Sequence, residues 1–119
     1  MRTHAIVIVN QEGVIQHLSE GAEALFGHAA TDCIGRTLDV LIPSEYRPRH
    51  WPAFRAAIER GALRFDPAAA NIPVMCADRT VRRFPGRLLV LRDALGQVVG
   101  AMGIFAPQSE DASRLPDLS

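Results

Sequence analysis

One histidine, His50, occupies a position in the sequence where an imidazole could bind a metal. Counting forward at helical spacing, the residues on its stripe are small or apolar: Ala53, Phe54, Ala57 and Ile58. A neutral imidazole on the inner face of a helix can coordinate a metal ion or the iron of a flat apolar cofactor. The same spacing is also typical of a hydrogen-bonded core histidine, so it leaves both interpretations open.

The other reactive side chains do not form a recognisable site. Cys33 and Cys76 have neither CxxC nor Cys/His metal spacing, and reduced thiols in a cytoplasmic setting fit them best. No Ser/His/Asp or Cys/His arrangement pairs a nucleophile with a base, and the pattern places His4, His17 and His28 at the surface or at strand ends. We therefore expect a protein that is not an enzyme.

Composition argues against several classes of partner. The chain has 119 residues, enough for one domain, and its 13 basic and 13 acidic residues cancel, so no long-range field recruits nucleic acid or anionic lipid. The apolar run from Ala5 to Val9 is too short for a signal segment or a membrane span. We expect a cytoplasmic domain without a nucleic-acid or membrane partner.

The hydrophobic pattern predicts strands and short helices in a definite order. Strands are expected over residues 5–9, 14–18, 65–76, 81–91 and 98–105. Short helical segments are expected after Ser19, which can act as an N-cap, and at 38–41. A longer helix is expected around His50, ending at Gly61.

Prolines limit these elements. Pro52 predicts that the His50 helix begins late or bends, Pro73 predicts an edge strand, and Pro85 predicts a bulge or an irregular strand start. The tail 107–119 is polar and proline-containing, which is typical of disorder. The predicted domain therefore covers residues 1–106.

Five short motifs stand in sequence along this order of elements. They are Asn10 to Gly13 between the first two strands, Ala22-Glu23-Ala24-Leu25-Phe26-Gly27, Ile34-Gly35-Arg36, Leu41-Ile42-Pro43, and Leu91-Arg92-Asp93 followed by Gly96 and Val99-Gly100. Each motif alone is weak, but together, over about residues 4 to 106, they resemble a PAS domain. The resemblance implies an α+β fold with a five-stranded antiparallel sheet, short helices and one longer helix packed on one face.

A narrower block, Ile42-Pro43-x-x-x-Arg47-x-x-His50, is similar to one subgroup of that family. It looks like the heme-binding PAS domains of the nitrogen-fixation oxygen-sensing histidine kinase and the direct oxygen sensor phosphodiesterase, in which the histidine of this helix is the proximal iron ligand. The resemblance implies that His50 ligates the iron of heme b. It also implies a heme-based sensor of a diatomic gas (CO, NO or O2) or of redox state.

The distal side departs from that pattern. The arginine that donates to iron-bound oxygen in those sensors is replaced here by Ala70, and the methionine that one of them uses as a sixth ligand is replaced by Ala68. Bound oxygen relies on distal donors more than carbon monoxide does. We therefore expect either an open iron that favours CO or NO, or an unexpected sixth ligand such as Met102.

Further contacts with the cofactor follow from the same resemblance. The expected walls are apolar side chains from the helix and the later strands: Phe54, Ile58, Phe65, Ile72, Leu88, Val90 and Met102. Arg64 matches the propionate-side position of the kinase, although a surface charge fits it equally well. Gly86 and the alanines at 68–70 are expected to leave space beside this wall.

Two other interpretations use the same fold. A flavin photoreceptor needs a cysteine after the Gly-Arg motif, and Cys33 precedes Gly35, so its nucleophile is missing. A heme-free PAS module for dimerisation, protein interaction or binding of another apolar small molecule fits the sequence as well. The sequence shows no kinase, phosphodiesterase or DNA-binding segment, so it does not identify an output. The resemblance to PAS domains implies a homodimer that signals to an output domain or partner protein.

Overall fold

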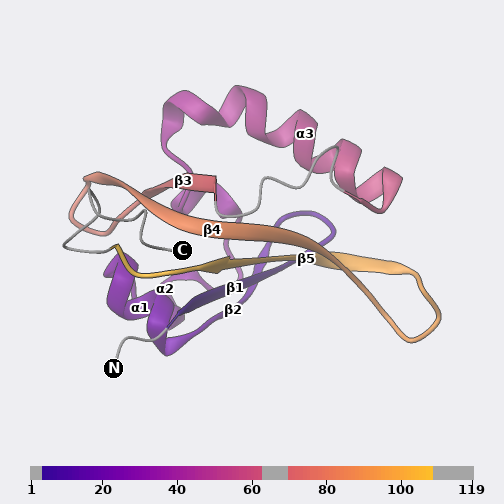
Figure 1. Cartoon of the computed structure of the whole chain (residues 1–119), viewed down its shortest axis with the longest axis horizontal. Helices are drawn as coiled ribbons and strands as arrows, with labels where there is room; N and C mark the ends of the chain where they lie inside the picture. Colours follow the sequence, from indigo (N-terminus) through magenta and orange to yellow (C-terminus); the bar gives the residue numbers. More distant parts are fainter. Residues whose placement is uncertain (1–3, 63–69, 109–119) are drawn as a thin grey trace, which may run out of the picture.

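The structure, a computed structural model, describes residues 4–62 and 70–108. Its centre is a five-stranded antiparallel sheet in the order β2-β1-β5-β4-β3 (Figure 1). The strands are β1 (Ala5–Asn10), β2 (Ile15–Leu18), β3 (Ala70–Met75), β4 (Val81–Arg92) and β5 (Val98–Phe105). With the helices described below, this confirms the predicted α+β fold. The predicted strand positions 65–69 and the tail from 109 onward lie outside the described residues.

The inner face of the sheet carries the hydrophobic core. In β1 the buried residues alternate with half-buried ones, and the buried set is Ala5, Val7 and Val9. Their partners on β5 are Phe105, Gly103 and Ala101, and the same face continues on β4 with Gly86, Leu88 and Val90. Phe26 packs edge to face against Phe84 and Phe105, at centroid distances of 5.2 and 5.4 Å, and so holds the first helix on this face.

The short helices form where local capping favours them. α1 (Glu20–Phe26) begins at Ser19, whose Oγ accepts a hydrogen bond from the backbone N–H of Ala22 at 3.2 Å, and it ends at Gly27 in the left-handed region. Three short segments follow, namely α2 (Ala30–Cys33) and the 3-10 turns η1 (Leu38–Val40) and η2 (Ser44–Tyr46).

The helix that carries His50 is α3 (Arg47–Arg60), and it ends at Gly61 as the sequence predicts. It begins directly after η2, so the predicted late start is wrong. Pro48 lies in the first turn, where a backbone N–H has no helical partner, and Pro52 removes only the bond to the carbonyl four residues earlier. Both prolines are exposed, so they do not interrupt the side of α3 that faces the protein.

The other two prolines show how strand order decides their effect. Pro73 lies on β3, an edge strand as predicted. Pro85 lies within the continuous strand β4, without the predicted bulge or irregular start. Its carbonyl accepts from the N–H of Ala106, just past the end of β5, and the N–H and C=O of a strand residue point toward the same neighbour. Pro85 has no backbone N–H to donate, and the position where this N–H would point lies just beyond the last paired residues of β4 and β5, so no strand hydrogen bond is lost.

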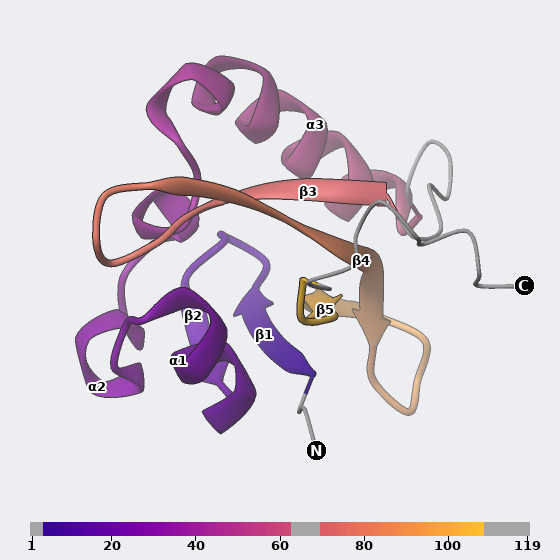
Figure 2. The same cartoon turned by 60° about the vertical axis from the view of Figure 1, so that its left-hand side comes forward.

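The helices divide the inner face between them. α1 and α2 lie beside β1 and β2, whereas α3 lies across the sheet near β3 (Figure 2). In residues 4–62 and 70–108, no helix has the length and hydropathy needed to cross a bilayer. The space between α3 and the strands is where the functional side chains converge.

Candidate ligand-binding site

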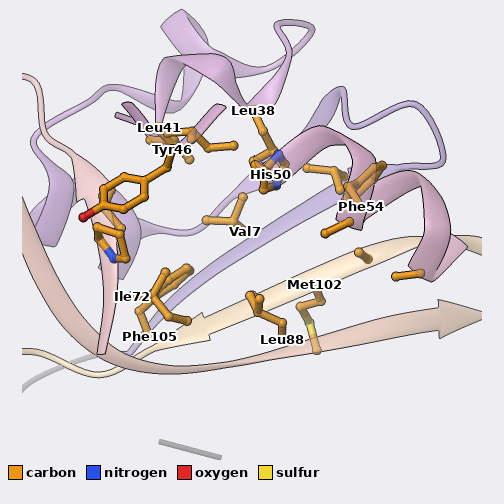
Figure 3. A pocket seen from close by; sticks show the side chains of 18 of the residues that line it. Val7, Leu38, Leu41, Tyr46, His50, Phe54, Ile72, Leu88, Met102 and Phe105 are labelled. Carbon is orange, nitrogen blue, oxygen red and sulfur yellow. The ribbon is translucent and has the colours of Figure 1, made fainter. Parts of the chain in front are cut away.

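A cavity of about 510 Å³ lies between α3 and the inner face of the sheet (Figure 3). Its described walls are almost entirely apolar and come from β1, β3, β4, β5, α1, α3 and the turns before α3. The polar side chains among the described lining residues belong to Tyr46, Arg49 and His50. This volume lies within the range of about 300–1,000 Å³ that small-molecule pockets occupy, and such pockets are mostly apolar with a few placed polar groups.

His50 lies on the cavity side of α3, as its helical spacing predicts. Its Nδ1 atom is fully buried and has no hydrogen-bond partner among the described residues. The ring is held by aromatic neighbours instead, with Phe54 stacked at 5.8 Å between centroids and Trp51 edge to face at 4.7 Å. This geometry argues against a hydrogen-bonded core histidine, because such a residue would satisfy its buried nitrogen. The ring therefore borders the cavity with a nitrogen that no described residue uses.

Burial lowers the pKa of His50 below its ordinary value, since the charged ring loses hydration, and the nearby Asp39 carboxylate opposes this shift only in part. The neutral form is therefore favoured at neutral pH. A neutral imidazole is the form that binds metals.

This shift predicts a pH dependence of stability in the ligand-free protein. A histidine with a lowered folded-state pKa contributes stability above its ordinary value of 6.5 and loses that contribution as the pH falls through this range. We expect the free energy of unfolding, measured by urea titration, to fall between about pH 7.5 and pH 5. His50→Phe should make this decline shallower, while the exposed-site variant His17→Gln should leave it unchanged. An equal slope in His50→Phe would contradict the burial argument.

Hydrogen bonds fix the helix turn that carries His50. The indole Nε1 of Trp51 donates to Asp39 Oδ1 at 2.8 Å, and Arg47 donates to the carbonyls of Ile42 and Asp39 at 3.0 Å each. The indole also lies against the β1–β2 turn, where a Cβ on Gly13 would be 2.5 Å from the ring. The start of α3 is therefore tied both to η1 and to the first hairpin.

The predicted wall residues fall into three groups. Those that line the cavity are Phe54, Ile58, Ile72, Leu88, Val90 and Met102. Arg64, Phe65 and Ala68 lie outside the described residues, and Ala70 is described only as the first backbone position of β3. Contact of any of these with a cofactor stays a prediction.

Two details differ from the expected pocket. The register of β5 pairs Met102 with Ile8 and Leu89, on the opposite face from Ala101 and Gly103, and Figure 3 shows its side chain extending away from His50. Although Met102 borders the cavity, this register does not favour its thioether as a sixth ligand. Gly86 does not leave empty space either, because a Cβ there would lie 3.0 Å from the Phe105 ring and 3.1 Å from Ile72.

The comparison with known families agrees with this architecture. A family model described as the PAS fold matches residues 3–112, nearly the whole chain. This chain is a PAS domain. PAS domains commonly dimerise and are linked to output domains.

Relatives of this PAS domain are much longer than it is. An uncharacterised protein of Azorhizobium caulinodans is 30% identical over 87 residues, which are 72% of this chain and 12% of the relative. The sensor protein FixL of Bradyrhizobium diazoefficiens is 37% identical over 46 residues, which are 39% of this chain and 9% of that protein. The chain thus spans about a tenth of the length of each.

Solved structures share the fold at low sequence identity. The PAS domain of a Colwellia psychrerythraea protein aligns with a TM-score of 0.72 and 21% identity, covering 87% of this chain and 85% of that one. A light-oxygen-voltage domain, from a study of a flavin analogue, aligns with a TM-score of 0.67 and 24% identity, covering 98% and 85%. At this identity both show the fold alone.

The cysteines of this PAS domain do not suit a photochemical adduct. Cys33 and Cys76 are both buried in the core, neither borders the cavity, and burial raises the pKa of each thiol above its ordinary value. A thiol kept protonated is a poor nucleophile.

Sequence reasoning missed several residues around the cavity. Trp51 packs against the ring of His50 without lining the cavity, and Tyr46, which borders the cavity, immediately precedes α3. Val7 and Val9 of β1 also border the cavity, but residues 5–9 are apolar at every position, so the sequence could not distinguish this pair from Ile6 and Ile8 on the other face. Nothing in the local sequence placed Tyr46 beside the cavity, because that depends on how α3 is set against β3.

Proposed function

We propose that this PAS domain is a sensor that binds one heme b through His50 and responds to a diatomic gas (CO, NO or O2) or to the redox state of the iron. The observation that carries the proposal is a buried imidazole nitrogen without a hydrogen-bond partner, in the wall of an apolar cavity of about 510 Å³. When bound, heme would supply an iron that reversibly takes gas ligands or changes oxidation state.

The side chains available as metal ligands favour a metal that is already bound in a macrocycle. In the described part of the chain, no group of three or more His, Cys, Asp or Glu side chains could hold a bare ion. A single histidine is, however, the usual protein ligand of a porphyrin iron, whose four equatorial ligands come from the macrocycle. The apolar walls would exclude water from both faces of such a ring, and Phe54 stacked on His50 would fix the imidazole plane.

The contacts of Trp51, the residue after His50, supply a route for the signal. A shift of the turn that carries His50 displaces Trp51, and with it the hydrogen bond to Asp39 and the contact with the β1–β2 turn. We infer that ligand changes at the iron would be relayed through these contacts to a homodimer partner, an output domain or another protein in the cytoplasm. The likeness to a sensor protein over 46 residues supports a sensing role.

The preference for CO or NO over oxygen stays a prediction from Ala68 and Ala70. The apolar walls also support the second candidate, a heme-free module that binds another apolar small molecule. A flavin is less favoured, because its polar ring edge would meet few partners among the described lining residues.

Titration of the purified protein with hemin tests the proposal. We expect a sharp Soret band that saturates at one heme per chain, together with quenching of the single tryptophan, Trp51, whose ring centroid is 4.7 Å from that of His50. Protein that stays colourless after hemin addition would refute heme binding and leave the heme-free module. A yellow protein with flavin absorption as purified would favour the flavin alternative.

A further inference from the structure

One end of the cavity, here called its basic end, has two lining residues, Tyr46 and Arg49, and a third residue, Arg83, that contacts Tyr46 without lining the cavity itself. Tyr46 borders the cavity, with its hydroxyl oxygen directed away from His50 (Figure 3). Arg83, on β4, reaches past the edge strand β3 and donates to this hydroxyl at 2.8 Å and to the carbonyl of Asn71 at 3.3 Å. Arg49, itself a lining residue, lies over the Tyr46 ring at 5.7 Å. Two guanidinium groups therefore flank one phenol at one end of an apolar cavity.

Neither arginine has a carboxylate partner in residues 4–62 and 70–108. The ion pairs of this part of the chain are Arg47–Asp39 and Arg82–Asp78. Glu45, next to Tyr46, forms no ion pair with either group. A guanidinium carries five N–H donors, and the contacts to Tyr46 and Asn71 leave several of those on Arg83 free. Positive charge with unused donors at this end is arranged to receive an anion.

We propose that the cavity takes an amphipathic ligand whose carboxylate groups are bound by Arg49 and Arg83 at the Tyr46 end. For the heme of the proposed function, on which this inference partly rests, these groups are the propionates. The site lies on η2, the start of α3 and β4. Sequence resemblance suggests Arg64 for this role, a residue outside the described part of the chain. The apolar walls bind the body of the ligand, while the two arginines orient it.

Metal-free protoporphyrin IX and its dimethyl ester test this site without iron, so ligation by His50 does not enter. Affinity is measured by quenching of Trp51. We expect the parent to bind the acid about tenfold more tightly than the ester, since the two exposed guanidinium contacts are partly screened. In the double variant Arg49→Gln/Arg83→Gln, the ratio of the two affinities should fall to about one.

Three matched variants make the outcome specific. Arg60→Gln removes an exposed charge from the other end of α3 and should keep the parent ratio. Tyr46→Phe breaks the Arg83 hydrogen bond but retains both charges, so it should also keep most of the preference for the acid. Arg64→Gln tests the competing position and should keep the ratio as well.

An unchanged ratio in the double variant, with native-like thermal unfolding, would overturn the proposal. So would a ratio lost in Arg64→Gln alone, or lost equally in Arg60→Gln. A further outcome is that the preference for the acid depends on the two arginines while the Soret spectrum does not depend on His50. That result would refute only the assignment of His50 as the iron ligand, and the proposed carboxylate site would stand. Failure of both porphyrins to bind the parent would count against both proposals.

Discussion

His50→Ala is expected to weaken hemin binding by more than about a hundredfold and to remove or strongly shift the Soret band. The reason is that His50 is the described cavity residue with an imidazole, and its buried Nδ1 has no other partner. Even changes to groups that only orient a metal ligand typically cost 10–100-fold in metal affinity, so loss of the ligand itself should cost more. The measurement is a hemin titration of the variant followed by absorption spectroscopy.

Free imidazole provides a sharp control for this variant. The truncated side chain leaves a space in the cavity wall, and millimolar imidazole should restore a parent-like spectrum if ligation is the function of His50. His17→Ala, an exposed histidine on β2, should bind hemin like the parent. A variant without His50 that keeps both the affinity and the spectrum of the parent would refute iron ligation at this position.

Ala101→Ile should change stability and ligand binding in opposite directions. Ala101 borders the cavity from β5, between Val9 and Val90, on the inner face of the sheet. A larger β-branched side chain there fills part of the cavity and suits a strand, and cavity-filling changes commonly stabilise a protein by about 0.5–2 kcal/mol. The ligand-free variant should therefore unfold at a higher temperature, while its hemin affinity should fall at least about tenfold because the apolar body of the ligand loses its space.

The neighbouring residue offers a matched control. Met102→Ile places the same new side chain one position along β5, on the opposite face of the sheet, across from Ile8 and Leu89. Because Met102 also borders the cavity, but from a register position turned away from the inner face, we expect a smaller fall in hemin affinity than Ala101→Ile causes, with the spectrum unchanged. If Met102→Ile alters the spectrum and Ala101→Ile does not weaken binding, then the inner face has been assigned wrongly and Met102 is a ligand.

His50→Ala and Ala101→Ile separate iron ligation from the space that the cavity offers a ligand. His50→Ala removes one bond to iron and leaves the cavity open, so it should affect hemin far more than metal-free protoporphyrin. Ala101→Ile reduces the volume for any ligand, so both porphyrins should bind more weakly. A protein that responds to Ala101→Ile but not to His50→Ala would be a binder of another apolar molecule.

Short-range interactions let the sequence alone determine several features of this protein. The caps at Ser19 and Gly27 and the end of α3 at Gly61 depend on atoms a few residues apart, so residue type and spacing were sufficient to predict them. Strand alternation and the helical spacing after His50 have the same local origin. The helical spacing correctly placed this histidine and Phe54 on the cavity side of α3.

Tertiary structure alone decided the features that join distant segments. Strand order determined that Pro85 falls where the ladder to β5 has ended, and the Phe105 ring filled the space expected beside Gly86. The basic end of the cavity joins Tyr46 to Arg83, 37 positions apart, across an edge strand. Such contacts follow from how α3 and the sheet pack together, and no local periodicity records that packing. The sequence therefore indicated the histidine that we propose as the iron ligand, whereas the fold decided which charges meet at the end of the cavity that it faces.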